Sequence, residues 1–201
     1  MKEKNKKKFQ FCIKENYRKC GNYISESRNY ILIILGFFIL FVLIGAFIPA
    51  PELIEQKILE FIENLLNKTE GMSHLELINF IFLNNIQSSF FGMISGIFFG
   101  FFSAMICALN GYILGFVAIK SAQVEGIFVL WRLFPHGIFE LPALFLSLGL
   151  GLKLGTFLFQ KNKIISFRNY LRESLRVFLF VIIPLLIIAA LIEGSFIFFL
   201  R

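Results

Sequence analysis

Aspartate is absent from this chain of 201 residues, so all 13 acidic residues are glutamate. Metal and phosphoryl chemistry that depends on aspartate is therefore excluded, and so is a Ser-His-Asp triad, although a glutamate version stays open. Histidine is also scarce, and His74 and His136 lie too far apart for a His-Glu-x-x-His zinc site. Charged residues make up only 16% of the chain, against about 25% in ordinary soluble domains, which argues against a soluble enzyme.

Apolar surface is what the chain has in abundance. Hydrophobic residues make up 57% of it, phenylalanine alone supplies 28 residues, and the mean hydropathy is +0.76. One small soluble core could not bury this much apolar surface. The composition therefore predicts that lipid is the solvent for most of the chain.

Residues 30–48 form an apolar run without a single charge. As a helix this run is about 30 Å long, which matches the hydrocarbon core of a bilayer. A secretory signal would have a shorter apolar region, of about 7–15 residues, after a short leader. Because a long polar segment precedes this run, we predict a retained transmembrane helix.

Lysine and arginine counts orient the chain, because positive segments near membrane ends stay in the cytoplasm. Residues 1–29 carry nine such charges and residues 160–176 carry five, whereas residues 49–83 carry two beside six glutamates. We therefore predict that the tail of residues 1–29 and the second basic segment are cytoplasmic, and that the acidic segment 49–83 is extracytoplasmic.

An odd number of crossings must then connect the acidic segment to the second basic segment, and three fit the length. Asn110-Gly111 and Pro135-His136-Gly137 supply the breaks between them, and a last helix at 177–200 bends at Pro184. We predict an all-α protein of the cytoplasmic membrane with five transmembrane helices in residues 30–200, the amino terminus cytoplasmic and the carboxyl terminus extracytoplasmic. The three middle crossings are expected at 82–109, 111–134 and 137–159.

The third crossing, 111–134, has an irregular feature. It would carry Lys120 and Glu125 close to the bilayer centre, where each charge costs about 2.5–3.5 kcal/mol on insertion scales. A helix that is broken here and faces protein or water would avoid this cost. We therefore predict that the third helix is broken.

Two amphipathic segments are expected outside the bilayer. In the tail, apolar residues recur at steps of three or four, which is typical of an interfacial helix, with a disordered tail as the alternative. In the acidic segment, one face is apolar and the other carries glutamates, which suits either docking of a partner or capping of the helix bundle. Ser73 and Glu76 have capping-box spacing, so the next helix should begin at residue 74 and run toward Asn110. The tail positions are Phe9, Ile13, Tyr17, Cys20 and Ile24; the acidic segment has Ile54, Ile58, Phe61, Ile62 and Leu65 opposite Glu52, Glu55, Glu60 and Glu63.

Small residues recur at every fourth position in two of the predicted spans. Small side chains let helix backbones approach closely in lipid. We therefore predict that these two faces pack on each other or on copies in a homo-oligomer. The first ladder is Ser88, Gly92, Gly96, Gly100, Ala104 and Ala108, and the second is Ala143, Ser147, Gly151 and Gly155.

The predicted topology also gathers charged side chains in the outer part of the membrane: Arg132, His136, Glu140 and Glu193. A glutamate on a membrane helix should face the bundle or a wet cavity and pair with a cation, for which Arg132 is the nearest candidate. This outer polar cluster would either bind a partner or gate a solute, or else it would pin the helix ends as a structural hydrogen-bond cluster.

Other chemistry has little support. Zinc binding through Cys12, Cys20 and Cys107 would need one thiol from inside the membrane. The positive charge of the tail already has a topological explanation, so it is no specific sign of nucleic-acid binding. We predict no enzyme activity, no metal, no cofactor and no nucleic-acid partner.

Several of these segments together resemble the stage II sporulation protein M family, over about residues 30–200. The resemblance implies a multi-pass membrane protein without known catalysis of its own; in spore-forming bacteria the family member anchors two cell-wall-degrading enzymes at the septum. We therefore expect a membrane scaffold or assembly subunit that contacts membrane or extracytoplasmic proteins. The alternative is a transporter or channel-like component that moves a small solute through a broken-helix site. The residues that carry the resemblance are Asn84, Asn85, the first ladder, Asn110, Gly111, Gly115, Pro135, His136, Gly137, Glu140, Pro142, Ala143, Gly151 and Gly155.

Overall fold

The computed structural model describes the backbone of residues 2–199 and the side chains of residues 13–131 and 137–199. Every regular element in this part of the chain is a helix. Five helices are long and apolar enough to cross a membrane, which confirms the predicted all-α membrane fold with five spans. The spans lie at 28–47, 74–97, 101–125, 137–159 and 163–199.

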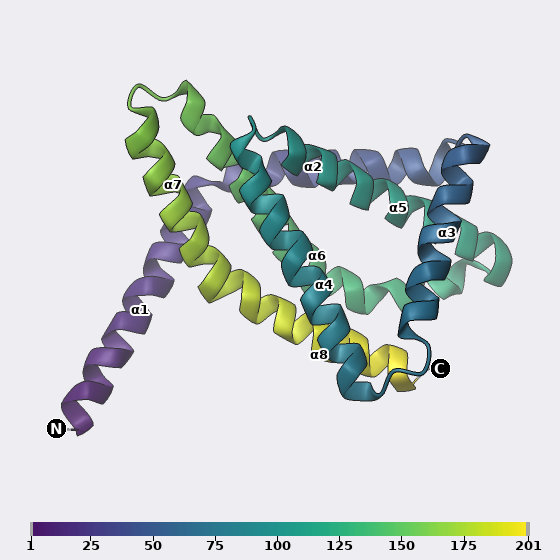
Figure 1. The fold of residues 1–201 in the computed structure, drawn as a ribbon, viewed down its shortest axis with the longest axis horizontal. Coiled ribbons are helices and arrows are strands. Elements are labelled where there is room, and N and C mark those ends of the chain that lie inside the picture. Colours follow the sequence, from purple (N-terminus) through teal and green to yellow (C-terminus); the bar gives the residue numbers. More distant parts are fainter. Residues whose placement is uncertain (1, 200–201) are drawn as a thin grey trace.

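The basic tail and the first span form two helices, α1 (Lys2–Glu26) and α2 (Arg28–Phe47). Only Ser27 separates them, and α1 leads away from the bundle at an oblique angle to α2 (Figure 1). The span at α2 agrees with the predicted first transmembrane helix within two residues.

Helix α3 (Glu52–Thr69) is the acidic amphipathic segment. It lies crosswise to α2 and α5, at the end of the bundle where α2 finishes and where the chain's C-terminal end also lies (Figure 1). The structure describes all of its residues, and only Ile58 among them is buried. Helix α3 therefore covers one end of the bundle without being part of its core.

The prediction of one long helix from residue 74 toward Asn110 was wrong. Helix α4 (His74–Ile94) continues as a 3₁₀ turn, η1 (Ser95–Ile97), and the chain then reverses into α5 (Phe101–Glu125). The reversal uses left-handed backbone at Phe99 (φ 56°) and Gly100 (φ 74°), a conformation that glycine adopts at little cost. The two spans are therefore 74–97 and 101–125, not 82–109 and 111–134.

This earlier reversal also removes the reason for a broken third helix. Helix α5 is continuous over residues 101–125, and the predicted break at Asn110-Gly111 lies inside it. Lys120 and Glu125 fall in the last turns of α5, and Gly126 (φ 86°) follows its end. Because the charges lie at a helix end, a break at the bilayer centre is not needed to accommodate them.

After α5 the chain crosses the bundle twice more. A 3₁₀ segment, η2 (Ile127–Leu133), leads into α6 (Phe134–Gly155) and the 3₁₀ turn η3 (Thr156–Phe159), so the predicted break at Pro135 instead falls in the first turn of α6. The last span comprises α7 (Lys163–Val177), the π-helical turn η4 (Phe178–Ile182) and α8 (Ile183–Phe199). The π turn ends two residues before Pro184, whose missing N–H cannot continue an α-helical hydrogen-bond ladder.

Contacts between helices fix their relative directions. Gly111 and Gly115 of α5 face Phe38 and Val42 of α2, so these two helices run parallel. Helices α4 and α6 are parallel as well, since Gly92 faces Leu148 and Gly96 faces Gly151, whereas α4 and α8 are antiparallel, since Ile78 faces Gly194 and His74 contacts Ser195. These directions are the ones that five successive crossings require. The end of the bundle that carries α3 is called here the α3 end, and the opposite end, with the α1–α2 junction and residues 160–163, the basic end.

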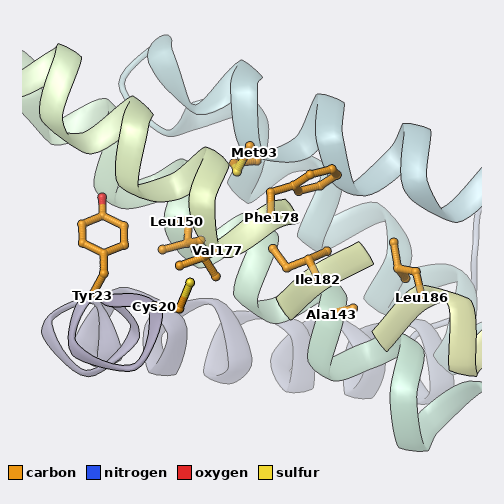
Figure 2. Close-up of a cluster of buried hydrophobic side chains, with 9 residues drawn as sticks. All are labelled: Cys20, Tyr23, Met93, Ala143, Leu150, Val177, Phe178, Ile182 and Leu186. Carbon is orange, nitrogen blue, oxygen red and sulfur yellow. The ribbon is translucent and has the colours of Figure 1, made fainter. Parts of the chain in front are cut away.

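A core that extends from the basic end into the bundle joins α1 to the spans. Nine buried side chains gather there, with Cys20 and Tyr23 of α1 facing side chains of the α7–α8 helix (Figure 2). This packing anchors the C-terminal part of α1 to the bundle. The nine residues are Cys20, Tyr23, Met93, Ala143, Leu150, Val177, Phe178, Ile182 and Leu186.

Candidate functional site

A partly buried polar pair lies between two spans. The Asn85 side chain on α4 donates a hydrogen bond of 2.6 Å from Nδ2 to Oε2 of Glu140 on α6. Asn85 is 8% exposed, and it stands about halfway along its span. A polar side chain inside a membrane needs a protein partner, because hydrocarbon offers none. The pair therefore ties α4 to α6 at a fixed register.

Of the other members of the predicted outer polar cluster, only Glu193 has a described side chain. The side chains of Arg132 and His136 lie outside the described residues. Glu193 is partly buried on α8, next to Gly194, which faces Ile78 on α4. Ile78 lies seven residues, or about 10 Å along the helix axis, from Asn85. Glu193 is therefore nearer the α3 end than Glu140.

Close backbone contacts join α4 to α6 along the two predicted ladders. A Cβ atom added to Gly96 would overlap the Gly151 carbonyl oxygen and lie 2.6 Å from the Gly151 Cα. One added to Gly151 would lie 2.8 Å from the Gly92 carbonyl oxygen, and one added to Gly155 would meet the backbone of Gly96 and Gly100. Ser103 on α5 completes this region by donating a hydrogen bond of 2.7 Å to the Gly92 carbonyl oxygen.

The ladders are not single continuous faces, however. Ser88 is exposed, and Ala104 and Ala108 belong to α5 because the chain reverses at Gly100. The i, i+4 spacing of the first ladder therefore continues across a turn between two helices.

Two glycines of the resembling motif, Gly111 and Gly115, lie at the contact of α5 with α2. A Cβ atom at Gly111 would lie 2.7 Å from the Phe38 carbonyl oxygen, and one at Gly115 would lie 2.9 Å from the Val42 carbonyl carbon. Asn110 is exposed and donates a hydrogen bond of 2.8 Å to the Ile106 carbonyl of its own helix. These positions therefore hold two helices together.

The motif residues on α6 differ from one another in burial. Ala143 is fully buried in the core, Pro142 is exposed, and a Cβ atom at Gly137 would meet nothing within 4 Å. The described contacts thus give Ala143 a packing role and Glu140 a polar one. The Pro135 and His136 side chains lie in the part that is not described.

Sequence reasoning missed a buried lysine near the basic end. The Nζ atom of Lys153 on α6 lies 3.0 Å from Ser27 Oγ, 3.6 Å from the Glu26 carboxylate and 3.8 Å from the centre of the Tyr23 ring. Ser27 in turn donates to the Tyr23 carbonyl, so one cation joins α6 to the α1–α2 junction. A charged residue in the last turns of a span was the signal that could have drawn attention to it.

Burial also perturbs the pKa values of two groups of α1, one of which, Tyr23, lies beside Lys153. It raises the pKa of the Cys20 thiol and that of the Tyr23 hydroxyl. Tyr23 Oη donates a hydrogen bond of 3.3 Å to the Tyr170 carbonyl on α7. Both groups therefore stay protonated at neutral pH, as suits a packed helix contact.

Helix α3 has one described ion pair with a span. Lys120 Nζ, near the end of α5, lies 2.6 Å from Oε1 of Glu55. The other glutamates of its polar face, Glu52, Glu60 and Glu63, are exposed. Among the residues whose side chains are described, no three His, Cys or Glu side chains lie close enough together to hold a metal ion.

Five apolar spans, small-residue contacts between parallel helices and a partly buried amide–carboxylate pair define a multi-pass helical membrane protein. The chain belongs to the stage II sporulation protein M family, because a sequence model of that family matches residues 34–196. This confirms the family resemblance drawn from the sequence.

One curated relative is similar to most of the chain. An uncharacterised protein of Methanocaldococcus jannaschii is 33% identical over 182 residues, which cover 84% of this chain and 78% of the relative. No solved structure matches the chain.

Proposed function

We propose that this chain is an integral scaffold or assembly subunit of the cytoplasmic membrane, which holds partner proteins on the extracytoplasmic side and performs no catalytic step itself. The observation that carries the proposal is the placement of α3. This helix lies across one end of the bundle with a single buried residue (Figure 1). Of its acidic face, Glu55 pairs with Lys120 of α5, and Glu52, Glu60 and Glu63 are exposed.

The orientation follows from charge. The basic end carries the nine Lys and Arg residues of positions 1–29 and the five of positions 160–176, while α3 carries four glutamates and two lysines. Positive segments are retained in the cytoplasm. We therefore place the basic end and the amino terminus in the cytoplasm, and α3 and the carboxyl terminus outside. The helix directions derived from glycine contacts support this arrangement.

The chemistry of α3 indicates what kind of partner it would bind. Its apolar side includes the buried Ile58 and the exposed Ile54 and Phe61, a pattern that suits an interfacial helix lying on a membrane surface. Glu52, Glu60 and Glu63 stay exposed on the other side. A protein with a basic surface, either extracytoplasmic or membrane-bound, complements this acidic face.

Solute transport is the second candidate function. The broken third helix that first suggested it does not occur within α5, which is continuous. The observation that still favours transport is the partly buried Asn85–Glu140 pair inside the bundle, because ionisable groups within spans mark solute or proton paths in many membrane proteins.

Two measurements on the full chain separate these functions. The first is affinity capture from membranes with the parent chain and with the double variant Glu60→Lys/Glu63→Lys, using Lys57→Glu as the control of opposite sign. Scaffolding predicts one specific partner that the double variant loses and the control retains. The second is ion and proton flux in vesicles; flux that Glu140→Gln abolishes, together with the absence of a specific partner, would establish transport instead.

A further inference from the structure

Polar side chains lie on the outward face of α4 in the middle of a membrane span. Asn84, Gln87 and Ser88 are all exposed. The span runs from His74 to Ile97, so Asn84 and Gln87 each lie about 15 Å from the nearer end of it. This depth corresponds to the centre of the hydrocarbon core rather than to the headgroup region.

Neither amide has a hydrogen-bond partner among the residues that the structure describes, in contrast to two other amides of the spans. Asn85 donates to Glu140, and Asn110 donates to a carbonyl of its own helix. Lipid tails offer neither donors nor acceptors, so an uncovered amide at this depth is strongly unfavourable. A further protein surface must therefore cover the Asn84–Gln87 face.

Space is available for such a surface. In Figure 1, α4 crosses in front of α6, and no helix is drawn in front of α4. Phe80 and Phe91 lie on the same side of α4 as the two amides, at helical spacings of four and seven residues from Asn84. The small Ser88 side chain lies at the edge of this face and permits close approach of another helix.

We propose that the covering surface is the same face of α4 on a second copy of this chain. Copies in one membrane share their orientation, so a two-fold axis along the membrane normal brings the same residues together at the same depth. An amide both donates and accepts hydrogen bonds, so Asn84 and Gln87 are complementary to their own copies without any charge having to be neutralised. The result is a homodimer held by interhelical amide hydrogen bonds.

Cysteine crosslinking of the full chain in phospholipid vesicles tests the contact. Ser88→Cys should crosslink two copies rapidly, and Leu109→Cys, which places a cysteine on the exposed surface of α5, should not exceed the rate of the unaltered chain. The unaltered chain is the background because it has cysteines of its own, of which Cys20 and Cys107 are buried. Equal rates for the two variants would overturn the proposal, and so would a chain that stays monomeric in vesicles.

The amides themselves are tested by energy-transfer measurement of self-association in the same vesicles. Asn84→Leu/Gln87→Leu should weaken association by about tenfold or more, because it removes the interhelical hydrogen bonds at a site where leucine is compatible with lipid. Asn79→Leu is the matched control, because Asn79 is an exposed amide of α4 that lies nearer the α3 end. Undiminished association of the double variant would overturn the proposal.

Crosslinking in cells distinguishes a second copy of this chain from another membrane protein as the surface that covers α4. Ser88→Cys should give a product of twice the chain's mass that contains only this chain, and a product formed only with another membrane protein would overturn self-association. The dimer contact does not depend on the scaffold function, since the partner test uses α3 and this one uses α4.

Discussion

The contact between α4 and α6 makes a sharp prediction for Gly96→Ala. The added Cβ atom would overlap the Gly151 carbonyl oxygen and lie 2.6 Å from the Gly151 Cα. Ordinary carbon contacts are about 3.5 Å or longer, so the two backbones must separate by about 1 Å. Backbone atoms cannot rotate away as a flexible side chain can. We therefore expect Gly96→Ala to lower the free energy of unfolding by about 3 kcal/mol, at the upper end of the usual cost of overpacking.

The assay is reversible unfolding in mixed micelles, with Gly36→Ala as the matched control. Gly36 lies in the first span, and a Cβ atom there would meet nothing within 4 Å. The control should change the free energy of unfolding by no more than about 1 kcal/mol, the scale of glycine's helix-propensity difference from alanine. If Gly96→Ala were no more destabilising than Gly36→Ala, the close backbone contact would be refuted.

Three further predictions concern other parts of the chain. Glu140→Leu removes the acceptor of the buried Asn85 amide and should cost about 1–3 kcal/mol in the same unfolding assay, whereas Glu140→Gln keeps an acceptor oxygen and should cost less; the reverse order would contradict the described pair. Lys153→Met should loosen the packing of α1 and speed alkylation of Cys20, measured by peptide mass spectrometry at pH 8. In the parent chain Cys20 should react slowly, because burial raises the pKa of its thiol. The control Lys163→Met, at an exposed lysine, should leave the alkylation rate unchanged. For topology, Phe98→Cys should be labelled from the cytoplasm and Phe128→Cys from outside; labelling of both from one side would contradict five crossings.

The number of spans could be predicted from the sequence, but the position of one turn could not. Charge distribution and the length of apolar runs are read directly from residue types, and these set five crossings. The reversal at Phe99 and Gly100 lies in a phenylalanine-rich segment without the usual polar turn residues, and the four-residue spacing of small residues continues through it. The periodicity therefore indicated a longer helix than the chain forms.

The partners in the polar contacts could not be predicted from the sequence either. The sequence singled out Glu140 as a membrane glutamate that needs a partner, yet its described partner, Asn85, lies 55 residues away. Pairing across that separation depends on the register of α4 against α6, which is fixed by the contacts of Gly92, Gly96 and Gly151. Residue types thus predict that a buried polar group will be paired, and only the packed helices determine with what.

The central claim, that α3 presents a partner-binding surface outside the membrane, is tested most directly by photo-crosslinking in living cells. A photoreactive amino acid is placed at Glu60, on the exposed acidic face, or at Phe61, on the apolar side of the same helix. We predict that position 60 yields one discrete protein product that Glu52→Lys/Glu63→Lys abolishes, while position 61 yields lipid or intramolecular products. Protein crosslinks that are equal from both positions, or absent from position 60, would contradict the account.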